Sequence, residues 1–341
     1  MAPGLIAFGI ALLASLALTM PVRALALRVG MVDLPGPRKV HLTPIPLLGG
    51  LAIYAGVVLA ILSVFDGAAR AQVEGIFAGA TLIIAVGILD DRGWLHHQIK
   101  LFVGMPLAAL VLLASGIHAQ VFSVVLSGQT GQLLDAALTV LWVMGITAAF
   151  SILDHMDGLC AGVAAMASVF FALLAYLNGQ MLVTVLAAAV LGASTGFLRW
   201  NFKPAKIFMG DGGAMLLGFL MATLGLKLRL AQPDHLTAWL VPVLVLGIPV
   251  FDTTLVSISR VRRGLLPFAS PGKDHTAHRL VDLGLGQRNA VLVLYLGGAA
   301  SGGLAVLGSY LPGRTAMALA ALVLAAGVVA IALLERAPYE R

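Results

Sequence analysis

The sequence contains one cysteine and very little charge. Cys160 has no second cysteine with which to form an internal disulfide, so a disulfide framework is excluded. Charged residues make up 11% of the chain and hydrophobic residues 60%, which is far from the composition of a soluble globular domain. No Pro-, Ser- or Gly-rich linker divides the chain, and no fixed repeat is evident. We therefore expect a single integral-membrane domain over residues 1–341.

Long apolar segments provide the structure instead. A helix needs roughly 17 to 25 apolar residues to cross a bilayer, and about eleven such segments are present. They lie near 5–27, 47–65, 73–89, 99–117, 136–152, 159–177, 180–197, 212–228, 236–258, 289–311 and 315–334. The sequence thus predicts an all-α polytopic membrane protein with about 10–11 transmembrane helices. Residues 118–135 alternate in polarity around SGQTG, which predicts a small β-hairpin on the outside.

Lysine and arginine predict the orientation. Cytoplasmic loops retain positive charge, and one set of alternate loops holds most of the basic residues. The opposite loops hold only Arg70, Lys227, Arg229 and Arg314. We expect a protein of the inner or plasma membrane with its N-terminus outside and its C-terminus inside. Topology and an anionic ligand explain the net charge of +6, so no nucleic-acid partner is needed.

Polar residues gather in the loops predicted to face the cytoplasm. These loops span residues 28–46, 90–98, 153–158, 198–211 and 259–288. Ligand sites of membrane proteins commonly form between packed helices. We expect the five loops to form one active site at the cytoplasmic helix ends.

Five aspartates are the candidate acids of this site. Asp90 and Asp91 follow an apolar run, where they form either a solvated helix end or a site for Mg²⁺, which prefers carboxylate oxygens. Asp154 and Asp157 are three residues apart and share one face if that segment is helical. Asp211 precedes an apolar helix, so it is either an N-cap or part of a phosphate site.

The fifth loop supplies basic residues. His275, His278 and Arg279 lie beside Lys273. The chain offers no thiolate and no closed set of four ligands, which argues against zinc. A basic cluster facing carboxylates is typical of a phosphate clamp opposite a metal ion. These residue types indicate phosphoryl transfer to or from a membrane substrate.

Ordered motifs carry a family resemblance over about residues 32–290. They are RKVHLTPIPLLGG (38–50), GILDDRGWL (87–95), the aspartates of 154–158, FLRWNFKPAKIFMGDGG (197–213) and the histidines of 275–279. The chain resembles the polyprenyl-phosphate N-acetylhexosamine-1-phosphate transferase superfamily, which begins peptidoglycan, O-antigen and teichoic-acid synthesis. PIPLLGG resembles the branch that uses UDP-N-acetylglucosamine more than the phospho-MurNAc-pentapeptide branch, which stays as an alternative.

The resemblance implies a reaction and its partners. The enzyme would transfer a sugar 1-phosphate, N-acetylglucosamine 1-phosphate before others, from a UDP-N-acetylhexosamine to undecaprenyl or another polyprenyl phosphate, releasing UMP. Mg²⁺, or Mn²⁺ in its place, would be the cofactor, and membrane lipids would surround the protein. The sequence leaves open whether it forms a homodimer, which sugar it uses, and whether transfer takes one step or two.

The resemblance also implies roles for individual residues. Asp211 would be the main metal ligand, and Asp90 or Asp91 would position or deprotonate the lipid phosphate, with Asp90 also a candidate metal ligand. The implied substrate-binding residues are Lys39, Asp154, Asp157, Asn201, Phe208, His275, His278 and Arg279.

Some positions depart from the family pattern. Ala148 and Ser151 replace two asparagines, His155 replaces a glycine, and Ala277 replaces the middle histidine. These changes affect expected contacts to the donor and leave every carboxylate in place.

Two other classes of protein share some of these features. DGAAR at 66–70 resembles the start of the CDP-alcohol phosphotransferase signature, but it lacks the spacing and the aspartates that follow. A transporter or an inactive scaffold of the same fold is supported only by the departures, and the retained aspartates argue against it.

Overall fold

The computed structural model describes residues 2–35, 43–230, 235–266 and 272–337. The chain folds into two compact units, Met1–Arg229 and Leu230–Arg341. Both are built from helices, which confirms the predicted all-α polytopic membrane protein. The prediction of a single domain with one shared active site stays a prediction.

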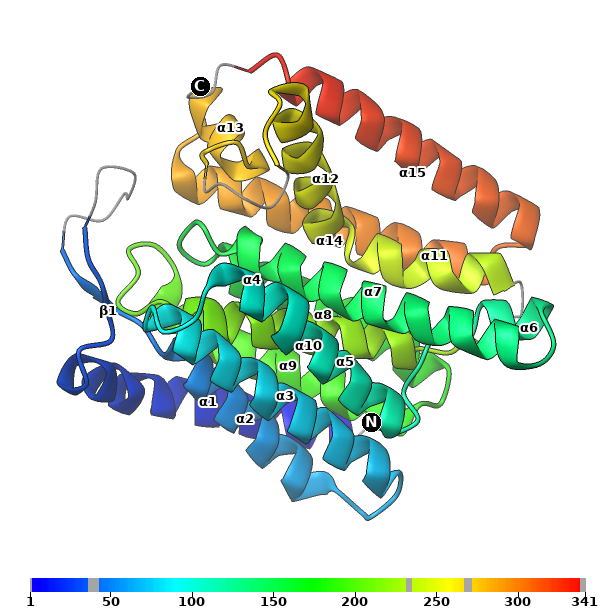
Figure 1. Ribbon diagram of the computed structural model, residues 1–341, viewed down its shortest axis with the longest axis horizontal. Helices are drawn as coiled ribbons and strands as arrows, with labels where there is room; N and C mark the ends of the chain where they lie inside the picture. Colours follow the sequence, from blue (N-terminus) through cyan, green and yellow to red (C-terminus); the bar gives the residue numbers. More distant parts are fainter. Residues whose placement is uncertain (1, 36–42, 231–234, 267–271, 338–341) are drawn as a thin grey trace. The chain divides into compact units, whose positions relative to one another are not determined.

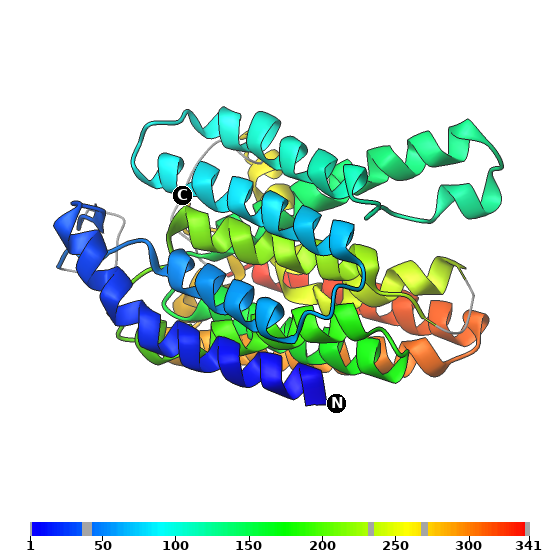
Figure 2. The same cartoon turned by 90° about the horizontal axis from the view of Figure 1, so that it is seen from below.

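The first unit is a bundle of apolar helices that run alongside one another (Figures 1 and 2). Its elements are α1 (Ala2–Arg28), α2 (Gly49–Val64), α3 (Arg70–Asp91), α4 (His97–Ile99), the π-helical turn η1 (Lys100–Gly104), α5 (Met105–Ala114), α6 (Phe122–Val125), α7 (Gln129–Leu153), α8 (Leu159–Leu177), α9 (Met181–Asn201) and α10 (Gly210–Lys227). Helix α10 packs against α2, α3, α7 and α8, and nearly all of its residues are buried. The start of α10 is therefore held among several helix ends.

The second unit contains α11 (His235–Val245), α12 (Gly247–Arg262), α13 (Thr276–Asp282), α14 (Gln287–Tyr310) and α15 (Gly313–Leu334). Helix α14 packs against the other four. Helices α11 and α12 form one broken apolar segment, bent by 77°. Their junction follows Pro242 and precedes Gly247, residue types that commonly occur at sharp kinks.

The helices are long and apolar enough for a multi-pass membrane protein. Among the described residues, seven helices satisfy the length and hydropathy of a membrane span, or up to eight if the bent pair is one span. The predicted number was higher because the sequence also marks α2, residues 100–114 and residues 212–228 as apolar, and α10, which covers the last of these, is not among the seven. Helix α2 and residues 100–114 are helical, but each is shorter than 18 residues.

The predicted β-hairpin at 118–135 is wrong. This segment contains α6 and the start of α7. The buried carboxylate of Asp135 accepts hydrogen bonds from the backbone N–H groups of Val121, Phe122 and Ser123, at 2.8 to 3.1 Å. These bonds satisfy the unpaired donors at the start of a helix, so the segment turns into α6 instead of pairing as strands.

The strands that do form lie in the first loop. β1 (Val32–Asp33) pairs antiparallel with β2 (Ile45–Pro46). The chain after β2 then bonds to the segment before α10, because Phe208 N–H donates to the Pro46 carbonyl at 2.9 Å and Gly49 N–H donates to the Phe208 carbonyl at 3.0 Å. The first loop is thereby fixed beside the start of α10.

Glycines allow α10 to approach its neighbours closely. A Cβ atom added to Gly87 on α3 would lie 2.3 Å from the Cα atom of Gly212, and one added to Gly50 on α2 would lie 2.3 Å from the Cα atom of Gly213. Both distances are too short for any side chain, and backbone on the facing helix cannot rotate away. The small residues therefore set the separation of α2, α3 and α10.

We expect Gly87→Ala to destabilise the protein by about 1 to 3 kcal/mol, the usual cost of overpacking, and to reduce any function that depends on the start of α10. Gly145→Ala on α7 is a matched control because nothing lies within 4 Å of its added Cβ atom. Thermal unfolding in detergent would measure both variants. A melting temperature for Gly87→Ala equal to that of the control would contradict this packing.

Candidate active site

Two carboxylates of the first unit share one lysine. The Nζ atom of Lys100 lies 2.6 Å from Oδ2 of Asp90 and 2.5 Å from Oδ2 of Asp211. Asp90 lies in the last turn of α3, Lys100 starts η1, and Asp211 lies in the first turn of α10. All three side chains are largely buried. The two acids that the sequence places 121 positions apart are thus brought to one cation.

Asp91 makes a different contact from its neighbour. Its carboxylate accepts hydrogen bonds from the backbone N–H groups of Asp211 at 2.9 Å and Gly212 at 3.3 Å. Asp91 therefore caps the N-terminus of α10 from another helix. Gly210 has a φ of 72°, and an added Cβ atom there would lie 2.4 Å from Oδ2 of Asp91. Glycine is needed at 210 both for the turn and for this approach.

The end of α7 adds Ser151 and Asp154. The hydroxyl group of Ser151 donates a hydrogen bond to Oδ1 of Asp211 at 3.0 Å. Ser151, one of the residues at which the sequence departs from the pattern that the resemblance implies, thus contacts an acid of the site. Burial raises the pKa of Asp154 to about 8, and the charges of Asp211, Asp91 and Asp157 add to the shift. A bound cation would oppose this shift, because an opposite charge favours the carboxylate.

Asp157 and Asn201 join two loops to each other. The buried amide group of Asn201 accepts a hydrogen bond from Gly158 N–H and donates one to the Ile207 carbonyl, at 3.1 and 3.0 Å. Asp157 accepts one from Ala205 N–H at 3.1 Å. These contacts fix the loop after α7 against the loop before α10. The predicted contacts of Asp157 and Asn201 with substrate stay predictions.

The structure brings most of the first unit's predicted residues together. Asp90, Asp91 and Asp211 are linked directly, and Asp154 lies close enough to Asp211 to be affected by its charge. The side chain of Phe208 is half-buried, and its backbone forms hydrogen bonds with the first loop. Lys39 lies outside the described residues.

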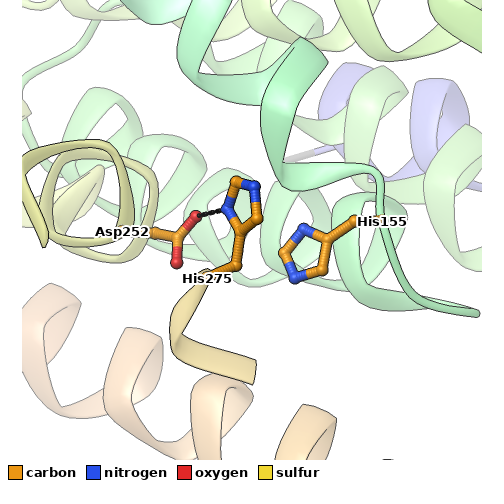
Figure 3. Close-up of side chains that lie close together, drawn as sticks. All are labelled: His155, Asp252 and His275. Carbon is orange, nitrogen blue, oxygen red and sulfur yellow. Dashed lines mark hydrogen bonds and ion pairs between the residues drawn. The ribbon is translucent and has the colours of Figure 1, made fainter. Parts of the chain in front are cut away.

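The second unit holds the predicted histidines. Asp252 on α12 bonds to Nδ1 of His275 at 2.8 Å (Figure 3) and accepts a hydrogen bond from Thr276 N–H at 2.7 Å. A carboxylate that holds one ring nitrogen fixes the orientation of the imidazole, the arrangement proteins use for histidines that bind a metal or an anion. Burial, together with the charges of His275 and Lys273, lowers the pKa of His278, so its neutral form is favoured.

Arg279 is fully buried, with a side-chain exposure of 0%. Its neighbour Asp274 is almost as buried and pairs with Arg260 at 3.0 Å and Arg263 at 2.5 Å. The segment that carries the histidines is therefore anchored at both its acidic and its basic residues.

Three functional candidates were missed by the sequence analysis. Lys100 lies at the start of the apolar segment predicted at 99–117, although it follows Asp90 by only ten residues. Asp252 lies inside the apolar run 236–258, where a lone acid could have indicated a buried partner. Glu335 follows the last apolar helix and resembles an ordinary helix end.

Fold and site together define a class. The chain is a polytopic membrane protein whose first unit gathers carboxylates around one cation at a common helix end, an arrangement suited to a divalent cation or a phosphate.

Comparison with known proteins identifies the family. The model of glycosyl transferase family 4 matches residues 73–229. A probable undecaprenyl-phosphate N-acetylglucosaminyl 1-phosphate transferase of Bacillus subtilis is 38% identical over 85% of this chain and 81% of its own length. A decaprenyl-phosphate N-acetylglucosaminephosphotransferase of Mycolicibacterium smegmatis is 35% identical over 93% and 85%. An undecaprenyl-phosphate alpha-N-acetylglucosaminyl 1-phosphate transferase of Escherichia coli K12 is 27% identical over 84% and 79%. The chain belongs to glycosyl transferase family 4.

Asp274 predicts an acid-dependent loss of stability. Burial raises its pKa, but the hydrogen bonds from Arg260 and Arg263 outweigh burial and hold the pKa at about 2, below the ordinary 3.8. A carboxyl group whose pKa is lower when folded stabilises the protein above its unfolded pKa. We expect about 2 kcal/mol of stability to be present above about pH 4 and lost as the pH falls toward 2.

Unfolding measured in detergent between pH 2 and 6 would test this prediction. Asp274→Asn should be less stable than wild type at pH 6 and should lose less stability on acidification. The exposed Asp66→Asn variant is the control and should follow wild type. Identical pH profiles for Asp274→Asn and wild type would contradict the ion-pair assignment.

Proposed function

We propose that this protein transfers N-acetylglucosamine 1-phosphate from UDP-N-acetylglucosamine to a polyprenyl phosphate. In this reaction an oxygen of the lipid phosphate bonds to the phosphorus that carries the sugar, and the bond from that phosphorus to the UMP oxygen breaks. The products are a polyprenyl diphosphate sugar and UMP. The names of the three relatives support the donor sugar and the lipid acceptor.

The observation that carries the proposal is the shared cation of Asp90 and Asp211. Their carboxylate oxygens lie 2.6 and 2.5 Å from one ammonium nitrogen, so these residues already accommodate a positive charge between them. Carboxylate oxygens are the ligands that Mg²⁺ prefers, and the donor set therefore fits this ion. Asp211 and Asp90 would hold it, and the bound ion would offset the charge that develops on the donor's diphosphate.

The remaining residues of the first unit have supporting roles in this proposal. Asp91 orients Asp211 by capping α10, and Ser151 holds the second oxygen of the Asp211 carboxylate. Lys100 favours the ionised form of both acids and would bind a substrate phosphate when the ion replaces it between them. Asp154, Asp157 and Asn201 would line the nucleotide pocket, as the resemblance implies.

The orientation is part of the proposal. Helix α10 starts at the acidic site and ends at Lys227, so the two ends of the first unit can be told apart. Arg92, Arg199, Lys203 and Lys206 accompany the site end in sequence, which is the richer in basic residues. By the positive-inside rule that end faces the cytoplasm, where a soluble UDP-sugar and a lipid phosphate can both reach it.

An assay of purified protein with undecaprenyl phosphate, Mg²⁺ and a panel of UDP-sugars tests this function. We expect UMP release and a sugar lipid with UDP-N-acetylglucosamine, and loss of both on addition of a chelator. Restored turnover on re-adding Mg²⁺ is the control for inactivation. Turnover that persists with excess chelator would refute the metal site, and no turnover with any UDP-sugar would refute the transferase.

Asp90→Asn and Asp211→Asn test the roles of the individual acids. Each is expected to lower kcat by about 10²-fold or more, since removal of one ligand charge weakens the site for the cation. Asp66→Asn, an exposed acid on a loop, should keep wild-type activity. Asp91→Asn retains an acceptor for the N–H groups of α10, so it should lose less activity than Asp91→Ala. Near-normal kcat in Asp211→Asn would disprove the assignment.

A further inference from the structure

All three nitrogen atoms of the Arg279 guanidinium group contact residues of the second unit. Nε donates to the Asp274 carbonyl at 2.9 Å, and Nη2 donates to the Ser259 hydroxyl at 2.9 Å. Nη1 donates to the Leu334 carbonyl at 2.8 Å, and Nη2 forms an ion pair with Oε1 of Glu335, also at 2.8 Å. The exposed fraction of the Arg279 side chain is 0%. The guanidinium group therefore binds groups of the protein and is not exposed to a substrate.

The contacts of Arg279 join the histidine-bearing α13 to the end of the last helix. Leu334 is the final residue of α15, and its carbonyl is one of those that a helix leaves without an internal partner. A positive charge is also favoured at this end of a helix. Glu335, with 8% of its side chain exposed, neutralises the buried guanidinium and also accepts a hydrogen bond from Arg262. The buried charge of Arg279 therefore depends on the C-terminal end of α15.

The other side of the same segment is held by α12. Asp252 binds both the imidazole of His275 and the N–H group of Thr276. Residues 274–282, which we call the histidine segment, are thus fixed by α12 near their start and by α15 through Arg279. Loss of one of these anchors would leave the other in place, so the segment would loosen without the unit unfolding.

We propose that Glu335, acting through Arg279, is a positioning residue for the histidine segment. Arg279 is then a positioning residue as well, instead of the diphosphate ligand that the family resemblance implies. This inference rests on the proposed function in one respect, because it takes His275 and His278 to contact the donor. It assigns a role in donor binding to the end of α15, which carries no motif.

Glu335→Gln tests the proposal because it removes the charge and keeps the shape. Glu74→Gln is the matched control, since Glu74 also pairs with an arginine, at 2.7 Å, but its side chain is 60% exposed. In the transferase assay we expect Glu335→Gln to raise the KM for UDP-N-acetylglucosamine by about tenfold, the order of effect of breaking a buried charge pair. The KM for the lipid should stay within about twofold, and the control should match wild type.

Two further measurements separate positioning from general stability. Amide hydrogen exchange without substrate should be faster in the histidine segment of Glu335→Gln and unchanged in α3 and α10. In a double-mutant cycle, Arg279→Gln with Glu335→Gln should raise the donor KM no further than Arg279→Gln alone, because both changes remove one interaction. If Glu335→Gln does not fold, Glu335→Asp keeps the charge on a shorter side chain and should show a smaller effect of the same kind.

Unchanged exchange in the histidine segment would overturn the proposal, and so would faster exchange with an unaltered donor KM. Equal increases in both KM values would also overturn it, since they indicate general damage. If wild type transfers no sugar, the proposed function fails, and hydrogen exchange alone then decides whether Glu335 orders the segment.

Discussion

The first unit depends on the neutralisation of several carboxylates that lie close together at the end of a helical bundle. Asp90 and Asp211 achieve this by sharing the ammonium group of Lys100, while Asp91 directs its charge at the N-terminus of α10. Both solutions use groups that are already positive or electron-poor, because unpaired charges are costly away from water. A catalytic cation placed in this setting would replace an existing interaction instead of creating a charge balance from nothing.

The acids can reach these partners because the helices pack closely. Asp91 reaches the N–H groups of α10 only because Gly87 and Gly212 let α3 and α10 approach, and because Gly210 adopts a left-handed turn. The glycines and the aspartates of these motifs therefore act together. The glycines set the distance between the helices, and this distance lets the aspartates reach their partners. Substitution of a glycine here would change the helix separation, and substitution of an acid would remove the hydrogen bond that this separation allows.

Much of the fold could be predicted from the apolar segments, because a helix that crosses a bilayer has few alternatives. The segment 118–135 could not, since its alternating polarity suggested strands, whereas the buried carboxylate of Asp135 stabilises a helix start through contacts that no local pattern reveals. The motifs predicted which acids belong to the site, but not which partner each acid binds. Asp90 and Asp91 are neighbours in sequence, and only their partners, Lys100 and the start of α10, distinguish them. The role of Asp252 could not be predicted, because it depends on a contact with His275, 23 positions away in the sequence.

The two acidic partners of Lys100 are synthesised at different times. Lys100 follows Asp90 by only ten residues, whereas Asp211 is made more than a hundred residues later. Asp90 can therefore find its counter-charge as soon as its own helix and the next segment have been synthesised, which lowers the cost of placing that carboxylate at the membrane boundary. Asp211 is made when Lys100 and Asp90 are both already present in the chain. The lysine that pairs with both acids in the folded protein is thus available to Asp90 before Asp211 has been made.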